Sequence, residues 1–365
     1  MDFIPCFDLS RQYKSIKQEL LKASEEVFEE SAFSLGRRVE LFEKEFADFC
    51  GVQHAIGVDN GTSAIVLALK AAGIKEKDEV LVPSNSFIAT AAAVSHIGGI
   101  PVFVDCTPDT WQLCPEDAGR KVTSNTKAII GVHLYGTPFD LDSVRKIAEA
   151  NNLLLIEDCA QAQGALYKGV PVGNFGKAGT FSFYPVKNLG AYGEAGAVVT
   201  NDAALELRVK KLRNHGSIEK YIHEEVGYNM RIDALQAAFL SVKLKHLKKW
   251  NQRRREIATF YRTAINNPKL VFQHVPEECE SVYHQFVATT EDRDGLRKYL
   301  SRHNIGTALH YPIPCHLQKA YASLGYSKGD LPNTEYLSEH CLSLPMFPEL
   351  SRTEVEYIVE VINNY

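Results

Sequence analysis

Hydrophobic residues along the chain fall into short runs that alternate with longer amphipathic segments. The runs are rich in β-branched residues, and they are HAIGV, EVLVP, IPVFVD, KAIIGVHLY, LLLIED, AGTFSF and GAVVTN. Most are separated by segments with helical spacing, such as SAIVLALKAAG and LDSVRKIAEANN. This alternation is typical of βαβ units, in which helices cover both faces of a sheet. The pattern therefore predicts an α/β fold with a mainly parallel sheet.

A longer helical pattern runs from Ala234 to about Ile265 without an internal glycine or proline. At the rise of an α-helix this segment reaches roughly 45 Å, long enough to connect two domains. We therefore expect a large domain at residues 1–245, including an N-terminal helical segment, and a smaller α+β domain at residues 246–365. The long helix at about 234–265 would join them.

The composition of the 365-residue chain argues against several classes of protein. Hydrophobic residues make up 45% and charged residues 23%, which is ordinary for a globular protein. The formal net charge of -5 gives no electrostatic footprint for nucleic acid, and the basic run KHLKKWNQRRR is interpreted as a solvated helix face. No signal peptide or membrane-spanning run is visible, and the eight cysteines form no C-x-x-C pair. A cytoplasmic protein with reduced thiols is expected.

Residues that follow the predicted strands carry candidate chemistry, because ligands of an open α/β sheet bind beyond the carboxyl ends of its strands. Gly61, Thr62 and Ser63 follow HAIGV and begin a helical segment, where backbone N–H groups and hydroxyls attract an anion. Ordinary helix capping by Thr62 or Ser63 is the alternative. Phe87 follows EVLVP and offers an aromatic face, although a core or lid phenylalanine fits the same position.

Asp158 closes the run LLLIED, and Lys187 follows AGTFSF within the segment YPVKNLGAYGEAG. A carboxylate at the end of a buried strand needs a cation or strong donors, unless it caps a helix. A lysine framed by an aromatic–proline pair and three glycines favours a covalent role. Pyridoxal phosphate (PLP) uses all four features. Its phosphate suits the anion site, its flat ring suits the aromatic face, its pyridine nitrogen suits the carboxylate, and its aldehyde suits the lysine. The sequence therefore predicts PLP as the cofactor, captured by Lys187 as a Schiff base.

Motifs along nearly the whole chain resemble those of the DegT/DnrJ/EryC1/StrS family of nucleotide-sugar aminotransferases. They are DNGTSAI, PSNSFIATA, VHLYGTP, IEDCAQAQGA, SFYPVKNLGAYGEAGAVVTND, GYNMRIDALQAA and LHYPIP. The resemblance implies the aspartate-aminotransferase-like fold, PLP fold type I, with a large domain on a mixed, mostly parallel sheet and a smaller α+β C-terminal domain. It also implies a homodimer with active sites at the subunit interface.

The resemblance further implies a role for each matching residue. Lys187 would hold the cofactor and carry the proton, and Asp158 would pair with the pyridine nitrogen. Gln161 would contact the ring hydroxyl, and Phe87 would stack on the ring. The expected phosphate ligands are Gly61, Thr62, Ser63 and Ser182, with Asn229 from the other subunit. Tyr184 and His310 are expected to border the sugar, although each also fits a structural role.

The favoured reaction moves the amino group of L-glutamate to a nucleotide-linked keto-sugar. The segment KNLGAYGEAG resembles relatives that aminate C3, which favours a dTDP-linked 3-keto-6-deoxyhexose over a 4-keto sugar or a UDP-linked 3-keto sugar. Sugar dehydratases of the family carry histidine in place of Lys187, so this lysine favours transamination. Gln163 stands where many relatives have histidine and Cys159 where alanine is usual, and neither is expected to touch the chemistry.

Three other hypotheses have less support in the residues. A Rossmann-type oxidoreductase is disfavoured because the glycines of GAYGEAG have the spacing G-x-x-G-x-x-G and follow a lysine. A non-catalytic regulator on the same fold is a remote alternative, since the residues that PLP chemistry needs are all present. His310, Cys315 and His316 could be imagined as a metal cluster, but no fourth ligand is visible, so no metal is expected.

Overall fold

The apolar runs of the sequence form the central sheet in the computed structural model, which describes residues 1–365. The strands are β1 (His54–Val58), β2 (Glu79–Pro83), β3 (Ile100–Val104), β4 (Thr126–Val132), β5 (Leu154–Asp158), β8 (Ala178–Ser182) and β9 (Gly196–Thr200). Their order is β1-β9-β8-β5-β4-β2-β3, with β9 antiparallel to both neighbours and the other pairs parallel. The predicted mixed, mostly parallel sheet is therefore confirmed.

Helices cover the two faces of this sheet because alternate residues of each strand point to opposite faces. On β2, Val80 packs in one hydrophobic core and Leu81 packs in another, and neither side chain is exposed. The first core lies under α3 (Gly61–Ala71), α4 (Ala89–His96) and α7 (Ala203–Arg213), and the second lies under α5 (Pro115–Arg120) and α6 (Leu141–Ala150). The apolar runs of the sequence are continuous because both faces of these strands are buried.

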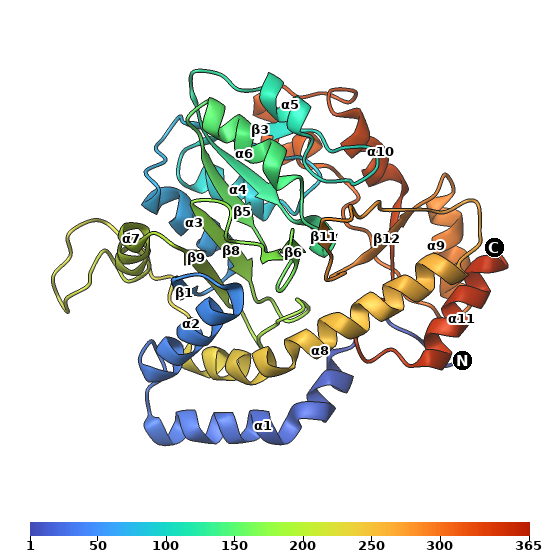
Figure 1. Cartoon of the computed structure of the whole chain (residues 1–365), viewed down its shortest axis with the longest axis horizontal. Helices are drawn as coiled ribbons and strands as arrows, with labels where there is room; N and C mark the ends of the chain where they lie inside the picture. Colours follow the sequence, from blue (N-terminus) through green and yellow to red (C-terminus); the bar gives the residue numbers. More distant parts are fainter.

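A single helix, α8 (Ala234–Ala264), runs for 31 residues from beside α1 and α2 to the C-terminal part of the chain (Figure 1). Its Trp250 packs in a core with α1 (Leu9–Glu30) and α2 (Arg37–Cys50), whereas its Ile257 belongs to the C-terminal core. The helix predicted for this segment is therefore present. It contacts the core that contains α1 and α2 and also the C-terminal core. The domain boundary at 245/246 stays a prediction.

The C-terminal part mixes short strands with helices. It contains β10 (Val271–Phe272), β11 (Cys279–Glu280), β12 (Phe286–Thr289), β13 (Cys341–Leu344), α9 (Arg293–Arg302), α10 (Pro332–His340) and α11 (Arg352–Asn363). Strands β10, β12 and β13 form one antiparallel sheet, and β11 pairs with β6 (Leu166–Tyr167), which also pairs with β7 (Val170–Pro171). The chain start joins this part, because Ile4 is buried in the C-terminal core. None of the helices combines the length and the apolar composition needed to cross a bilayer.

Candidate functional site

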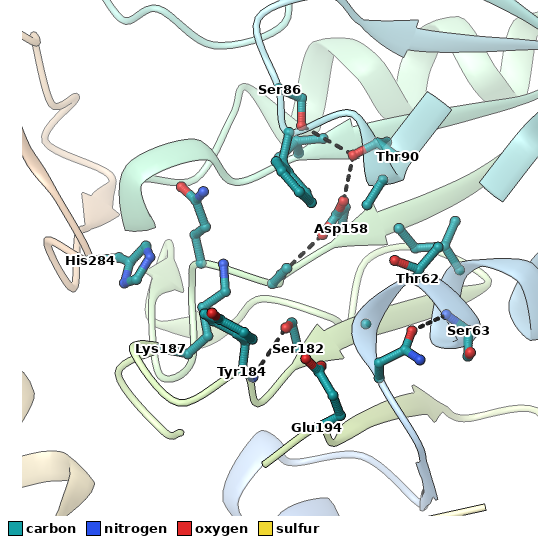
Figure 2. A pocket seen from close by; sticks show the side chains of 18 of the residues that line it. Thr62, Ser63, Ser86, Thr90, Asp158, Ser182, Tyr184, Lys187, Glu194 and His284 are labelled. Carbon is teal, nitrogen blue, oxygen red and sulfur yellow. Dashed lines mark hydrogen bonds between the residues drawn. The ribbon is translucent and has the colours of Figure 1, made fainter. Parts of the chain in front are cut away.

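A cavity of about 810 Å³ opens where the carboxyl ends of β2, β5 and β8 meet the N-terminus of α3 (Figure 2). Parallel strands bring their carboxyl ends to the same edge, so residues distant in sequence converge there. The predicted site residues in its walls are Gly61, Thr62, Ser63, Phe87, Asp158, Gln161, Ser182, Tyr184, Lys187 and His310. Asn229 does not line this cavity.

Asp158, the last residue of β5, is a buried carboxylate held by two hydrogen bonds. Its Oδ2 accepts from Thr90 Oγ1 at 2.8 Å, and its Oδ1 accepts from the Ala160 N–H at 3.1 Å. Burial raises the pKa of Asp158, whereas these hydrogen bonds and the charge of Lys187 lower it. No helix begins just after this strand, so the alternative that Asp158 caps a helix is wrong. A buried carboxylate without a close cation is a strong site for a positively charged group.

Lys187 lies in the turn between β8 and β9, and its side chain points into the cavity (Figure 2). The Lys187 N–H donates to the Tyr184 carbonyl at 2.8 Å, which closes the turn. Burial lowers the pKa of Lys187 to about 8, and the nearby Asp158 charge partly opposes this shift. A larger share of such an amine is neutral near pH 7 than of an ordinary lysine. The neutral amine can attack a carbonyl and accept a proton.

Close backbone approach explains two glycines that frame the lysine turn. A Cβ at Gly190 would lie 2.1 Å from the Pro185 carbonyl oxygen, and one at Gly61 would lie 2.6 Å from Ser182 Cβ. Neither glycine has the positive φ of a left-handed turn. The first contact compacts the turn after Lys187, and the second brings the start of α3 against the end of β8.

The start of α3 and Ser182 together form an anion cradle. Asn60 Oδ1 accepts from the Ser63 N–H at 2.8 Å, so Asn60 caps the helix and the alternative of a Thr62 or Ser63 cap is wrong. The first N–H groups of a helix have no partner within it. The N–H groups of Gly61 and Thr62 and the hydroxyls of Thr62 and Ser182 are therefore available to a phosphate, whereas the Ser63 N–H is already used.

Two side chains are arranged to contact a flat ring. Phe87 is 55% exposed, which makes the core alternative wrong, and its ring centroid lies 5.7 Å from that of Tyr311. Gln161 Oε1 accepts from the Tyr135 N–H at 2.7 Å, and Gln161 Nε2 donates to the Tyr311 hydroxyl at 3.1 Å. Since the backbone N–H can only donate, the orientation of the Gln161 amide is fixed. Its nitrogen remains the group available to a ring oxygen.

Tyr184 and His310 both line the cavity. Tyr184 is 48% exposed, so the core alternative for this residue is wrong. His310 Nδ1 lies 2.7 Å from Ser343 Oγ, which also gives this histidine a structural bond. Burial and the charge of Lys187 lower the pKa of His310 to about 4, so the imidazole is neutral.

Sequence reasoning missed several residues of the cavity walls. They are Ser86, Thr90, Glu194, His284, Gln285 and Tyr311. Thr90 and Tyr311 lie within the motifs PSNSFIATA and LHYPIP, and so could have been considered. His284 belongs to no motif that was identified, and only the folded chain brings it beside Lys187.

Gln163 lies behind the cavity rather than in its wall. This side chain is fully buried, and its Nε2 donates to the carbonyl oxygens of Ser182 at 2.7 Å and Ala160 at 3.2 Å. It therefore ties the loop after β5 to the end of β8. Gln163, which stands where relatives more often have histidine, therefore holds the backbone behind the cavity and does not form part of the cavity wall.

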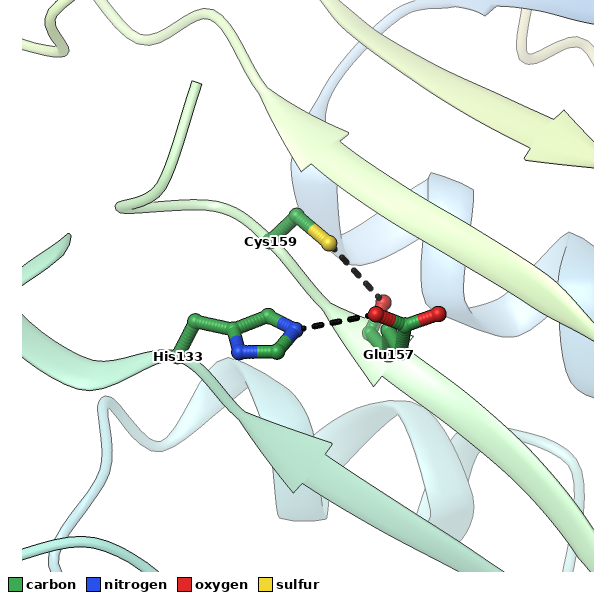
Figure 3. A group of neighbouring side chains, drawn as sticks. All are labelled: His133, Glu157 and Cys159. Atoms are coloured by element: carbon green, nitrogen blue, oxygen red, sulfur yellow. Dashed lines mark hydrogen bonds and ion pairs between the residues drawn. The ribbon is translucent and has the colours of Figure 1, made fainter. Parts of the chain in front are cut away.

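A buried group of His133, Glu157 and Cys159 has the residue types of a metal site, but the oxygens of Glu157 already have partners (Figure 3). The Glu157 carboxylate accepts from His133 Nε2 at 3.1 Å and from the N–H groups of Gly173 and Phe175 at 2.7 Å. With its oxygens occupied in this way, Glu157 fixes a loop to the end of β5 and is explained as a structural group.

The residues of the cavity fit PLP in the chemistry of their donors. The Asp158 carboxylate accepts from the neutral donors Thr90 Oγ1 and Ala160 N–H, and a protonated pyridine nitrogen would meet its buried charge. The free N–H groups at the start of α3 suit a phosphate, and Lys187 is the only lysine in the cavity wall. All these groups face one space of suitable size for a cofactor and a substrate.

This fold and this site together define a PLP-dependent aminotransferase. The model of the DegT/DnrJ/EryC1/StrS aminotransferase family matches residues 14–363, and the chain belongs to that family. Its members are PLP-dependent sugar aminotransferases, so the predictions of the family, the fold, the cofactor and the enzyme class are confirmed.

Relatives of known name resemble the chain over its full length. It is 45% identical over 362 residues to dTDP-3-amino-3,6-dideoxy-α-D-galactopyranose transaminase of Aneurinibacillus thermoaerophilus, covering 99% of each chain. It is 43% identical over 365 residues to a Geobacillus stearothermophilus protein named pleiotropic regulatory protein, covering 99% of this chain and 98% of the other. The crystal structure of S. venezuelae DesV matches with a TM-score of 0.98 at 40% identity, covering 100% of this chain and 98% of that one.

Proposed function

We propose that the protein aminates a nucleotide-linked keto-deoxysugar, with dTDP-3-keto-6-deoxyhexose as the favoured substrate and L-glutamate as the amino donor. The observation that carries the proposal is the meeting of Lys187 and Asp158 with an anion cradle in one cavity of about 810 Å³. The name of the Aneurinibacillus thermoaerophilus relative, a dTDP-3-amino-3,6-dideoxyhexose transaminase, supports the choice of nucleotide and of C3.

The proposed chemistry depends on a proton that Lys187 accepts and returns. When bound, PLP supplies an electron sink for the charge left when a C–H proton departs. Lys187 Nζ takes this proton, and its pKa of about 8 suits an exchange near neutral pH. Asp158 would keep the pyridine nitrogen protonated, and Gln161 Nε2 would donate to the ring hydroxyl. Tyr184 and His310 would border the sugar.

The proposal is tested by following the visible absorption of the PLP-loaded protein through both halves of the reaction. We expect L-glutamate to remove the visible band and dTDP-3-keto-6-deoxyhexose to restore it, with the amino sugar detected by mass spectrometry. The same assay with a dTDP-linked 4-keto sugar and a UDP-linked 3-keto sugar provides the comparison. Faster recovery with either of these sugars would transfer the assignment to it.

A non-catalytic regulator is the second candidate, favoured by the name of the Geobacillus stearothermophilus relative. The two candidates differ in the second half of the reaction. A regulator would bind PLP without turning over any keto-sugar, whereas an aminotransferase would release an amino sugar. Release of product with any of the three sugars therefore excludes a purely regulatory role.

The active unit in this proposal is a homodimer in which Asn229 of one subunit reaches the phosphate bound in the other. Asn229 lies at the end of residues 214–229, a segment that projects from the body of the molecule after α7 (Figure 1). In this segment Tyr221 is 82% exposed and Val226 is 95% exposed. Apolar side chains clustered on a projecting loop are typical of a surface that another chain covers.

Mixing two inactive variants tests this arrangement. We expect K187A and N229A proteins, each poorly active alone, to gain activity when mixed under conditions that exchange subunits. The hybrid dimer would contain one site with both Lys187 and Asn229 intact. Turnover is compared before and after mixing, and differently tagged subunits verify the exchange. Exchange without a gain in turnover would show that Asn229 does not complete the opposite site.

A further inference from the structure

His284 is a cavity residue that the proposed chemistry has not used. It lies just before β12, in the wall of the same cavity as Lys187 and His310 (Figure 2). Its side chain is almost entirely buried, with the residue 8% exposed. Burial, the positive charge of Lys187 and that of Arg254 hold the pKa of His284 well below its usual value. The imidazole is therefore neutral, with one nitrogen protonated and the other not.

The hydrogen bonds around Asn188 determine which nitrogen carries the proton. Asn188 Nδ2 donates to the Val282 carbonyl at 3.0 Å and to Asn251 Oδ1 at 2.9 Å. A backbone carbonyl can only accept, so the nitrogen of the Asn188 amide faces Val282 and its oxygen faces His284. His284 Nδ1 lies 3.1 Å from that oxygen and must donate to it. The lone pair consequently lies on Nε2, which has no partner in the chain.

The support behind this tautomer is itself fixed. Asn251, on α8, donates through Nδ2 to the Gln163 carbonyl at 2.8 Å, so its own amide is oriented as well. Gly164 makes room for it, since a Cβ at Gly164 would lie 2.9 Å from Asn251 Nδ2. A chain of buried amides thus connects the loop after β5 to His284. Because both amides and His284 Nδ1 have their partners, this buried network holds one orientation.

We propose that His284 is a specificity-determining residue whose Nε2 accepts a hydrogen bond from a hydroxyl next to the keto carbon of the sugar. A neutral acceptor suits a hydroxyl donor and repels a carboxylate, because both the lone pair and the carboxylate oxygens are acceptors. His284 therefore favours the sugar over the amino-acid donor at this position of the cavity. The inference rests on the proposed keto-sugar substrate, and it identifies the hydroxyl of that substrate that the cavity wall binds.

The test compares three enzymes with three substrates. The enzymes are wild type, H284L and H284Q, and the substrates are dTDP-3-keto-6-deoxyhexose and its analogues lacking the hydroxyl at C2 or at C4. We expect kcat/KM of the wild type to fall about tenfold when the hydroxyl that donates to His284 is removed, because this is the usual effect of losing one hydrogen bond to a neutral group. With the full substrate, kcat/KM of H284L should be lower than that of the wild type by about the same factor, and it should not fall further with that analogue. H284Q should have a kcat/KM between those of H284L and the wild type.

Two controls separate this role from a structural one. The glutamate half-reaction, followed by loss of the visible band, should proceed at the wild-type rate in H284L, because the amino donor does not use Nε2. H303L, which removes a partly buried histidine at the end of α9 outside the cavity wall, should match the wild type throughout. Equal sensitivity of wild type and H284L to both missing hydroxyls would overturn the inference. Absence of turnover in the wild type would instead contradict the proposed substrate.

Discussion

K187A is expected to bind PLP without the visible band of the covalently attached cofactor and to lose sugar amination by on the order of 10⁴-fold or more. The variant loses both the amine that captures the cofactor aldehyde and the group that moves the proton. Lys187 is the only lysine in the cavity wall, so no neighbour can replace it. Absorption spectra with and without L-glutamate, together with single-turnover amination of the keto-sugar, measure the two losses separately.

Lys243 provides the matched control for this experiment. Burial also lowers its pKa to about 8, but it lies on α8 outside the cavity and donates to the Gly190 carbonyl at 2.5 Å. K243M should therefore keep the visible band and its response to glutamate. A band that persists in K187A but disappears in K243M would show that the wrong lysine has been assigned. A lowered pKa alone does not define the reactive lysine, because position in the cavity matters as well.

The fold could be predicted largely from the spacing of apolar residues. Strands buried on both faces carry continuous apolar runs, and the runs HAIGV and LLLIED coincide with β1 and β5 to within a residue. The antiparallel direction of β9 could not be derived from spacing, since a buried strand looks the same in either direction. The resemblance to the family implies a mixed sheet, and the structure shows that β9 is the antiparallel strand.

The candidate site was predictable where chemistry follows directly after a strand. Asp158 ends β5 and Lys187 lies in the turn that follows β8, and the parallel sheet brings the ends of β5 and β8 together. His284 was not predictable, because its place depends on how the loop before β12 packs against Asn188. The sequence shows that glycines frame the lysine turn, but only the structure shows that Gly190 is needed for a close contact with the Pro185 carbonyl.

D158N is expected to reduce sugar amination by on the order of 10³-fold while leaving the protein folded. The loss follows because a neutral amide cannot hold a proton on the pyridine nitrogen, and a fixed charge in a buried site has a large effect on the barrier. The fold should persist, since the new Oδ1 can accept from the Ala160 N–H while Nδ2 donates to Thr90 Oγ1. The Thr90 hydroxyl can then turn toward Ser86 Oγ, which lies 3.1 Å away.

T90V separates the charge of Asp158 from its hydrogen bonds. This variant removes the 2.8 Å bond from Thr90 Oγ1 and keeps the carboxylate, so we expect less than about a tenfold loss of kcat. Thermal unfolding of both variants reports the fold, and titration with PLP reports cofactor affinity. D158N should keep its unfolding temperature near that of the wild type, because a buried neutral amide avoids the desolvation that raises the pKa of Asp158. If D158N and T90V lost activity equally, the hydrogen bonds rather than the charge would be responsible, and the pairing of Asp158 with the pyridine nitrogen would be wrong.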